Sequence, residues 1–207
     1  MILRELKLMT TEHKDYIGAK IGMWLFLFTE ILLFGGLFIL YSVYLSRYAD
    51  FFHKAGKDLN VIIGTINTLI LITSSFAIAA SITALQKGDK VKSIIAVTFT
   101  ILCAFSFLVN KFFEWTAKFE HGIYPNSTKL LELPKGEITF YNLYYVMTGL
   151  HAFHVFVGIV LLSIVLFFIQ SDKINKDNFI TLENSALYWH IVDLIWIFLY
   201  PLFYLIV

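Results

Sequence analysis

Five long stretches of apolar residues dominate this chain, and each is long enough to cross a lipid bilayer as a helix. Such a helix needs about 20 mostly apolar residues, because each residue adds only ~1.5 Å along the helix axis. Backbone groups in lipid must also be hydrogen-bonded within their own segment. The sequence therefore predicts an all-α integral membrane protein, a bundle of five transmembrane helices. The predicted spans are residues 20–44, 60–85, 91–113, 140–169 and 184–207.

The composition agrees with a membrane protein and argues against several other classes. Hydrophobic residues make up 58% of the 207 residues, and 21 of these are Phe. The 16 basic and 15 acidic side chains nearly cancel and lie mostly in the short connections, so no basic surface for nucleic acid is expected. A single cysteine, Cys103, excludes intrachain disulfides and cysteine-rich metal sites.

The connections between the spans are short and polar, so we expect a single membrane domain over residues 1–207 without a soluble domain. The charged N-terminal residues lack the pattern of a cleaved signal peptide. An odd number of spans places the termini on opposite sides of the membrane. Nine Lys and Arg residues fall on the N-terminal side and seven on the other, and the nine occupy the shorter segments. This bias predicts the N-terminus inside and the C-terminus outside.

Ionisable residues inside the spans are the main functional signal. His190 and Asp193 lie three residues apart in YWHIVDLIWIFLYPLFYL, on one face of the predicted helix. Glu30 lies near the middle of the first span, where an isolated charged carboxylate is disfavoured, so we expect it to be protonated or paired. Such residues usually face the interior of a helix bundle and often mark function.

His151 and His154 share a helix face in the fourth span, and two interpretations remain open for them. With His190, Glu30 and Asp193 they could complete a haem or metal site, because imidazole and carboxylate bind Fe, Zn or Cu. Alternatively they form hydrogen bonds between helices, helped by the small residues Gly149, Ala152 and Gly158, which allow close approach. The second interpretation is favoured, because di-iron bundles use Glu-x-x-His rather than His-x-x-His.

Further polar residues are interpreted as packing or boundary residues. Asn67 lies with Ser74 and Ser75 on one stripe of the second span, which predicts a face that packs on another helix. Glu114 and Trp115 close the third span, where we expect them to anchor the helix at the membrane surface. No nucleophile with its base and no phosphate-binding glycine loop is present. A proton-coupled carrier using Glu30 and Asp193 is a further, disfavoured, hypothesis.

Five motifs in a fixed order carry a resemblance to a known family. They are WLFLFTEILLFGGLF, NTLILITSS, EWTAKFEHGIYP, FYNLYYVMTGLHAFHVFVGIVLL and YWHIVDLIWIFLYPLFYL. From about Gly22 to the C-terminus the chain resembles subunit III of the haem-copper oxidases, of the cytochrome c oxidase type. The segments TGLHAFH and YWHIVDLIW are the most specific, because the family carries a TG-H-x-x-H helix followed by a W-H-x-x-D helix.

The resemblance implies a non-catalytic subunit with no haem, copper or other cofactor of its own. Its partners would be the catalytic subunit I and other subunits of a proton-pumping terminal oxidase, which hold the haem and copper, and possibly a larger respiratory supercomplex. In the family, subunit III stabilises the catalytic subunit, supports proton uptake and holds phospholipids. Glu30 matches an acidic residue beside the family's lipid cleft, and His151, His154, His190 and Asp193 match buried polar positions. We interpret all of these, with Asn67, as structural residues.

One departure from the family concerns the number of spans. The long form of the family has seven spans, and this chain matches the last five, so the lipid cleft between the two groups would be open or completed by a partner. Five-span forms accompany bacterial oxidases, which predicts the bacterial inner (plasma) membrane. The alternatives are subunit III of a quinol oxidase, an accessory chain of a nitric oxide reductase, or a self-sufficient membrane haem or metal protein.

Overall fold

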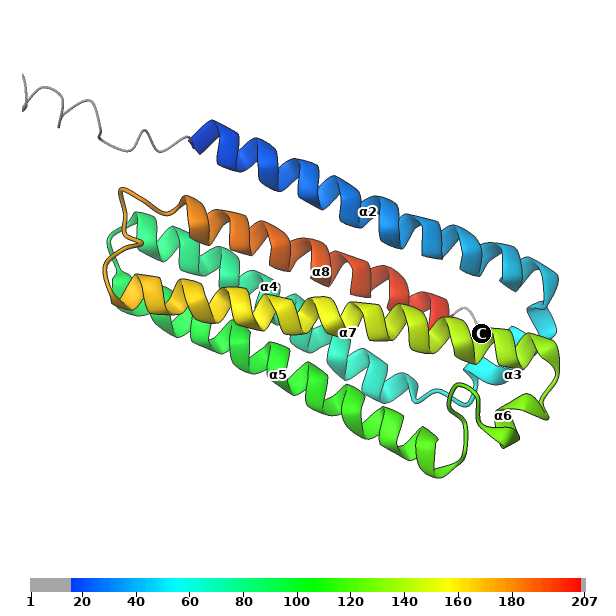
Figure 1. Cartoon of the computed structure of the whole chain (residues 1–207). Coiled ribbons are helices and arrows are strands. Elements are labelled where there is room, and N and C mark those ends of the chain that lie inside the picture. The colour runs from blue at the N-terminus through cyan, green and yellow to red at the C-terminus, as the bar shows by residue number, and fades with distance from the viewer. Residues whose placement is uncertain (1–15, 206–207) are drawn as a thin grey trace, which may run out of the picture.

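The computed structural model describes residues 16–205, and helices account for most of them (Figure 1). The helices are α2 (Tyr16–Arg47), α3 (Ala49–Gly56), α4 (Val61–Gln86), α5 (Lys90–Glu120), α6 (Thr128–Leu131), α7 (Lys135–Gln170) and α8 (Ile180–Tyr204). The five long helices are each apolar and long enough to cross a membrane. The predicted five-helix membrane bundle is therefore confirmed, with one long helix for each predicted span. Helix α8 ends at Tyr204, and residues 206–207 of the last predicted span lie outside the described residues.

The long helices form two packed pairs with one helix alongside. The pair α4 and α5 contacts the pair α7 and α8 through α4 against α8 and α5 against α7. Helix α2 lies on the outside of this four-helix core, along α7 and α8 (Figure 1). Most of α2 therefore presents apolar side chains outward, for example Trp24 at 61% and Phe28 at 57% exposure.

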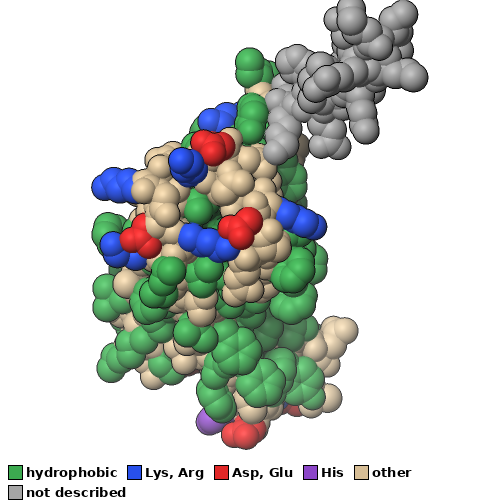
Figure 2. Space-filling model, turned by 90° about the vertical axis from the view of Figure 1, so that its left-hand side faces the viewer, with side chains coloured by type: hydrophobic (Ala, Val, Ile, Leu, Met, Phe, Trp, Pro, Cys, Tyr) green, Lys and Arg blue, Asp and Glu red, His purple; other side chains and the backbone are tan. Residues whose placement is uncertain are grey.

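Charged side chains gather at the end of the bundle where α2, α5 and α8 begin. Figure 2 looks onto this end and shows Lys, Asp and Glu side chains together, with hydrophobic side chains covering the flank below. Ion pairs link the helix ends there, Lys20 with Glu183 at 3.0 Å and Lys90 with Asp172 at 2.7 Å. The short helices α3 and α6 lie at the opposite end (Figure 1).

Local sequence explains where the helices begin. The Asn60 side chain accepts hydrogen bonds from the backbone N–H groups of Ile62 and Ile63 at the start of α4. Asp89 caps α5 in the same way through the N–H of Lys92. Side-chain oxygens satisfy the free amides of a first helical turn, which is why Asn and Asp favour these positions. Gly88 supplies the positive φ of 81° that turns the chain between α4 and α5.

The core is built around α8. Trp189 and Trp196 are fully buried and are the largest side chains of the interior. Gly158 of α7 leaves room for Trp189, because a Cβ at Gly158 would lie 2.7 Å from the indole ring. The close approach that the small residues predicted is therefore confirmed at Gly158. Tight packing of α7 on α8 fixes the direction in which the polar residues of both helices point.

Candidate functional site

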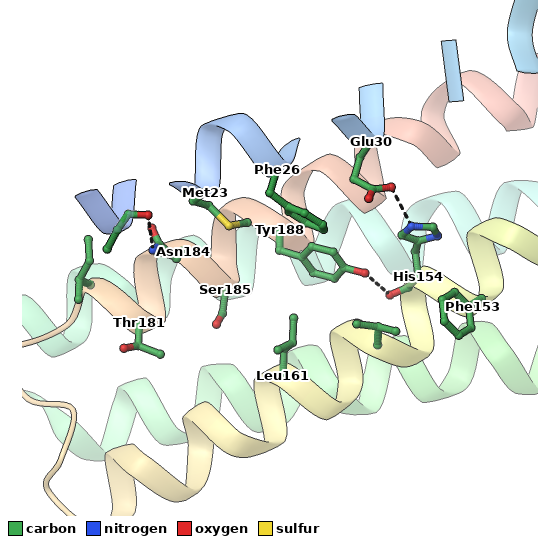
Figure 3. Close-up of a pocket in the computed structure, with 13 residues that line it drawn as sticks. Met23, Phe26, Glu30, Phe153, His154, Leu161, Thr181, Asn184, Ser185 and Tyr188 are labelled. Atoms are coloured by element: carbon green, nitrogen blue, oxygen red, sulfur yellow. Dashed lines mark hydrogen bonds and ion pairs between the residues drawn. The ribbon is translucent and has the colours of Figure 1, made fainter. Parts of the chain in front are cut away.

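Glu30 of α2 is paired with His154 of α7. Nε2 of His154 lies 2.9 Å from the Glu30 carboxylate, and Nδ1 lies 2.7 Å from the Leu150 carbonyl oxygen (Figure 3). Because the carbonyl can only accept, Nδ1 carries a proton. Both ring nitrogens of His154 are therefore used, one by the Leu150 carbonyl and one by the Glu30 carboxyl group. The expectation that Glu30 is protonated or paired is met by this contact.

The Glu30–His154 pair closes one end of a pocket between α2, α7 and α8 (Figure 3). The pocket has a volume of about 490 Å³ and a mostly apolar lining that includes Met23, Phe26 and Leu161. Tyr188 lies on its wall and donates a hydrogen bond to the His154 carbonyl at 3.0 Å. Toward the charged end of the bundle the lining becomes polar, with Thr181, Asn184 and Ser185.

Side-chain hydrogen bonds join α8 to α4 along their whole contact. The pairs are Trp189 with Ser74 (3.0 Å), His190 with Ser75 (2.6 Å), Trp196 with Thr68 (3.0 Å) and Tyr200 with Thr65 (2.7 Å). The predicted packing role of the Ser74 and Ser75 stripe is therefore confirmed. The structure brings His190 and Asp193 to the same side of α8, as their spacing predicts, and both line a hollow between α8 and α4.

Asp193 and His151 are the buried candidates without hydrogen bonds. Neither carboxylate oxygen of Asp193 and neither ring nitrogen of His151 has a partner within residues 16–205. The Ser75 hydroxyl, which is bonded to His190, is also the polar group in contact with the Asp193 side chain, although the geometry is poorer than that of an ordinary hydrogen bond. His151 packs between the rings of Phe107 and Trp196, with ring centres 5.4 and 5.1 Å away. Both side chains are thus enclosed by the bundle rather than joined to a polar network.

Asn67 connects α4 to α5. Its side-chain oxygen accepts a hydrogen bond of 2.8 Å from the Asn110 amide, and Asn67 is fully buried. Its own amide nitrogen has no partner within the described part of the chain. The six predicted site residues therefore fall into four separate places: Glu30 with His154 between α2 and α7, Asn67 between α4 and α5, His190 with Asp193 between α4 and α8, and His151 in the core beside Trp196.

A buried ion pair that sequence reasoning misread lies between α5, α7 and α8. Lys111 contacts Glu114 at 3.1 Å, and its remaining N–H groups reach the hydroxyls of Tyr144 at 2.9 Å and Tyr204 at 3.1 Å. Both tyrosines donate to the other carboxylate oxygen of Glu114, at 2.5 and 2.7 Å. The lysine's three donors and both carboxylate oxygens are used, which is the condition for a stable buried pair.

The interpretation of Glu114 as a surface anchor is wrong, because its side chain is only 5% exposed and that of Lys111 only 3%. The i, i+3 spacing of the two residues was a signal for their pairing, the same spacing that relates His190 to Asp193. The apolar stretch ends at this point in the sequence, which made the pair resemble the polar end of a span.

The three intramembrane histidines each face a different neighbour. His154 is bonded to Glu30, His190 to Ser75, and His151 lies among aromatic rings. Within residues 16–205 no three His, Cys, Asp or Glu side chains come together in a metal-binding arrangement. The arrangement can join helices and shield charge, and it does not assemble ligands around one point.

Fold and site together define a multi-pass membrane subunit whose buried polar groups join one helix to the next. The family model described as cytochrome c oxidase subunit III matches residues 8–206. The chain belongs to this family. It is a subunit III of a haem-copper oxidase, a protein that assembles with other oxidase subunits.

Three relatives illustrate the range of the family. Cytochrome c oxidase subunit 3 of Thermostichus vulcanus is 33% identical over 94% of this chain and 90% of its own length. A probable quinol oxidase subunit 3 of Staphylococcus saprophyticus is 28% identical over 95% of this chain and 94% of its own. A heme-copper oxidase subunit I+III of Aeropyrum pernix is 27% identical over 94% of this chain and 24% of its own.

Proposed function

We propose that this chain is the non-catalytic subunit III of a cytochrome c oxidase, which stabilises the catalytic subunit and supports its proton uptake. The partner subunits hold the haem and copper, and this chain holds neither. The observation that carries the proposal is the separation of the three intramembrane histidines, each of which faces a different neighbour. The match to subunit III over almost the whole chain supports the same role.

The partner in direct contact is the catalytic subunit I. Support comes from the Aeropyrum pernix relative, whose name describes subunits I and III together and whose chain matches this one over only 24% of its length. In such a protein the two parts share one chain, so they are held side by side. A larger respiratory supercomplex containing the oxidase belongs to the same proposal.

The oxidase lies in a bacterial plasma membrane, with the charged end of the bundle in Figure 2 on the inner side. The excess of Lys and Arg in the short segments at this end supports the orientation. The bacterial relative from Staphylococcus saprophyticus is matched over 94% of its length, which supports the bacterial location.

The pocket between α2, α7 and α8 holds a phospholipid. Its apolar part suits an acyl chain, and the polar residues Thr181 and Asn184 lie at the end where a headgroup would sit. Met23→Trp fills the apolar part, so the purified complex should then retain less phospholipid, measured by mass spectrometry. Unchanged lipid content in the variant would refute this occupant.

Purification of the tagged chain in mild detergent tests the central proposal. The expected result is that a haem-copper catalytic subunit copurifies with the tagged chain. When this chain is then separated from its partners, the haem absorbance and the copper should stay with the partners. A tagged chain that purifies without any oxidase subunit would overturn the proposal. Haem or copper retained by the separated chain would overturn its non-catalytic part.

The electron donor has a second candidate. The Staphylococcus saprophyticus relative is a probable quinol oxidase subunit at an identity close to that of the cytochrome c oxidase relatives. Oxygen consumption by the purified complex separates the two, because a cytochrome c oxidase consumes oxygen with reduced cytochrome c and a quinol oxidase with a reduced quinol.

A further inference from the structure

His190 is a partly exposed polar residue of α8 in the hydrocarbon region of the membrane. It lies 10 residues after the first residue of α8, or ~15 Å along the helix, and ~21 Å before its last residue. Its Nδ1 is bonded to the Ser75 hydroxyl at 2.6 Å, whereas Nε2 has no hydrogen bond to any residue among 16–205. A polar group in hydrocarbon is costly without a hydrogen bond, so Nε2 is expected to meet a partner from outside this chain.

The His190 ring lines a hollow of about 380 Å³ between α4 and α8. Around the ring the hollow is mostly apolar, with Ile72, Phe76, Leu194 and Ile197. All four of these side chains are exposed, and Phe76 is exposed by 76%, so the hollow opens toward the lipid. Its size falls within the range of small-molecule sites, which are typically apolar with a few polar groups that orient the ligand.

The Ser75 hydroxyl allows Nε2 of His190 to act either as a donor or as an acceptor. A hydroxyl both donates and accepts, and a neutral imidazole carries a proton on only one nitrogen. When Ser75 donates to Nδ1, the ring proton is on Nε2, which then donates into the hollow. When Nδ1 donates to Ser75, Nε2 accepts, and the hydroxyl can turn its proton toward Asp193, which it also contacts. His154 lacks this freedom, because the Leu150 carbonyl fixes its Nδ1 as a donor.

The depth and the reversible nitrogen together indicate the class of ligand. A phospholipid offers only acyl chains in the hydrocarbon region, which is about 30 Å thick, and acyl chains cannot form hydrogen bonds. A membrane quinone carries two carbonyl oxygens on a planar ring and dissolves in the bilayer through its apolar tail. Each carbonyl accepts a hydrogen bond, and after reduction each is a hydroxyl that donates one. The exposed Phe76 ring suits the planar ring, and the aliphatic side chains suit the tail.

We propose that the hollow between α4 and α8 binds a membrane quinone, with a ring oxygen of the quinone bonded to Nε2 of His190. Nε2 donates to the carbonyl of the oxidised form and accepts from the hydroxyl of the reduced form. Ser75 is a positioning residue, because it orients the imidazole and takes up the change of donor and acceptor at Nδ1. The inference goes beyond the proposed function, which assigns no quinone to this subunit, and it concerns binding alone, without electron transfer.

Photolabelling of the tagged chain, purified in mild detergent with its partners, tests the site. The probe is an azido derivative of decylubiquinone, and adducts are mapped on this chain alone, so quinone sites on other subunits do not contribute. The expected adducts lie within residues 72–76 of α4 or 190–197 of α8 and are suppressed by excess decylubiquinone. Adducts only in the pocket between α2, α7 and α8, or adducts that decylubiquinone does not suppress, would overturn the proposal. So would a chain without adducts, as expected if a helix of another subunit covers the hollow.

Two substitutions of His190 test the role of Nε2. Asparagine places its amide near the position of Nδ1, so His190→Asn keeps a bond to Ser75 and loses the one to the ligand. Glutamine reaches the position of Nε2, so His190→Gln keeps the bond to the ligand. We expect half-maximal labelling of His190→Asn to need about 2- to 12-fold more probe, the range of one neutral hydrogen bond, and that of His190→Gln to stay close to wild type. His53→Asn, at an exposed histidine of α3, is the control and should not change labelling.

The labelling is compared at equal folded fraction, which the melting temperature of each variant provides. Equal labelling of His190→Asn and wild type, or an equal loss in both His190 variants, would overturn the role of Nε2. These results are separate from the proposed function. A chain that copurifies with a catalytic subunit but carries no such label contradicts only the quinone site. A labelled chain that purifies without any oxidase subunit contradicts only the proposed function.

Discussion

The carboxylate of Glu30 and Nε2 of His154 are 2.9 Å apart and join the outer helix α2 to α7. Their side chains are 14% and 10% exposed, so the contact lies in largely apolar surroundings. His154 also donates to the Leu150 carbonyl, so both of its ring nitrogens have a partner. The carboxyl group of helix α2 thus has a polar partner on α7.

Glu30→Gln should leave assembly intact and alter sustained turnover at most modestly. The glutamine amide can still donate to Nε2 of His154, so one hydrogen bond between α2 and α7 is kept. Copurification with the oxidase and the decline of oxygen consumption during turnover are the measurements. Complete loss of the complex would contradict the prediction.

Glu30→Leu provides the contrasting variant. It leaves Nε2 of His154 without its partner, and an unsatisfied buried group costs about 1–3 kcal/mol. We expect a lower melting temperature and faster loss of activity than with Glu30→Gln. Equal behaviour of the two variants would show that the hydrogen bond to His154 contributes nothing measurable.

Lys111→Met should be among the most destabilising single substitutions. It removes the cation from a cluster in which Glu114 is 5% exposed, leaving a buried carboxylate with only the two tyrosine hydroxyls. Breaking a buried ion pair from one side costs about 3–5 kcal/mol. Thermal unfolding of the purified protein should show a large fall in melting temperature.

The double variant Lys111→Met with Glu114→Gln separates charge from packing. Neither side chain is then charged, so it should recover part of the stability lost in Lys111→Met. Lys57→Met, at an exposed lysine, is the control and should change stability little. If the double variant recovers no stability, the stability lost in Lys111→Met comes from the packing around Lys111.

Hydropathy predicted the fold because the need to satisfy backbone groups in lipid leaves few alternatives to helices. The helix ends were predicted less well. Helix α5 continues to Glu120 and α7 begins at Lys135, well beyond the predicted limits of residues 113 and 140. A helix can continue beyond the hydrocarbon region of the membrane, because its backbone hydrogen bonds form there too. Hydropathy detects only the apolar part of each helix. For the same reason the short polar helices α3 and α6 were not predicted.

The partners of the buried polar residues depend on helix packing, which a single sequence does not specify. The position of Glu30 inside a span already indicates that it needs a partner. Only the packing of α2 along α7 identifies His154 as that partner. The Lys111–Glu114 pair was missed because its role depends on Tyr144 and Tyr204, two residues of other helices. Asp193 is a further case, since the position of Ser75 beside it becomes visible only once the register of α4 and α8 is known.

The ion pair between Lys54 of α3 and Glu137 of α7 should give a pH-dependent contribution to stability. The hydrogen bond and charge of Glu137, 2.8 Å away, raise the pKa of Lys54 above its ordinary value. A raised lysine pKa means that the contribution is complete below the unfolded value of about 10.4 and is lost as the pH rises through the folded value.

The melting temperature of wild type and Lys54→Met should therefore differ slightly at pH 8 and converge as the pH rises through the folded pKa of Lys54. Because Lys54 is exposed, the difference at pH 8 should also shrink in high salt. A difference that grew with pH would contradict the assigned direction of the pKa shift.

Gly158→Ala should disturb the contact between α7 and α8, since the added Cβ would lie 2.7 and 2.8 Å from two carbons of the Trp189 ring. Trp189 is fully buried and bonded to Ser74, so it cannot move without breaking that bond. Overpacking of this kind costs about 1–3 kcal/mol. Gly36→Ala is the matched control, because nothing lies within 4 Å of a Cβ at Gly36. The melting temperature should fall for Gly158→Ala and stay the same or rise for Gly36→Ala, and equal effects would show that Trp189 tolerates the closer helix.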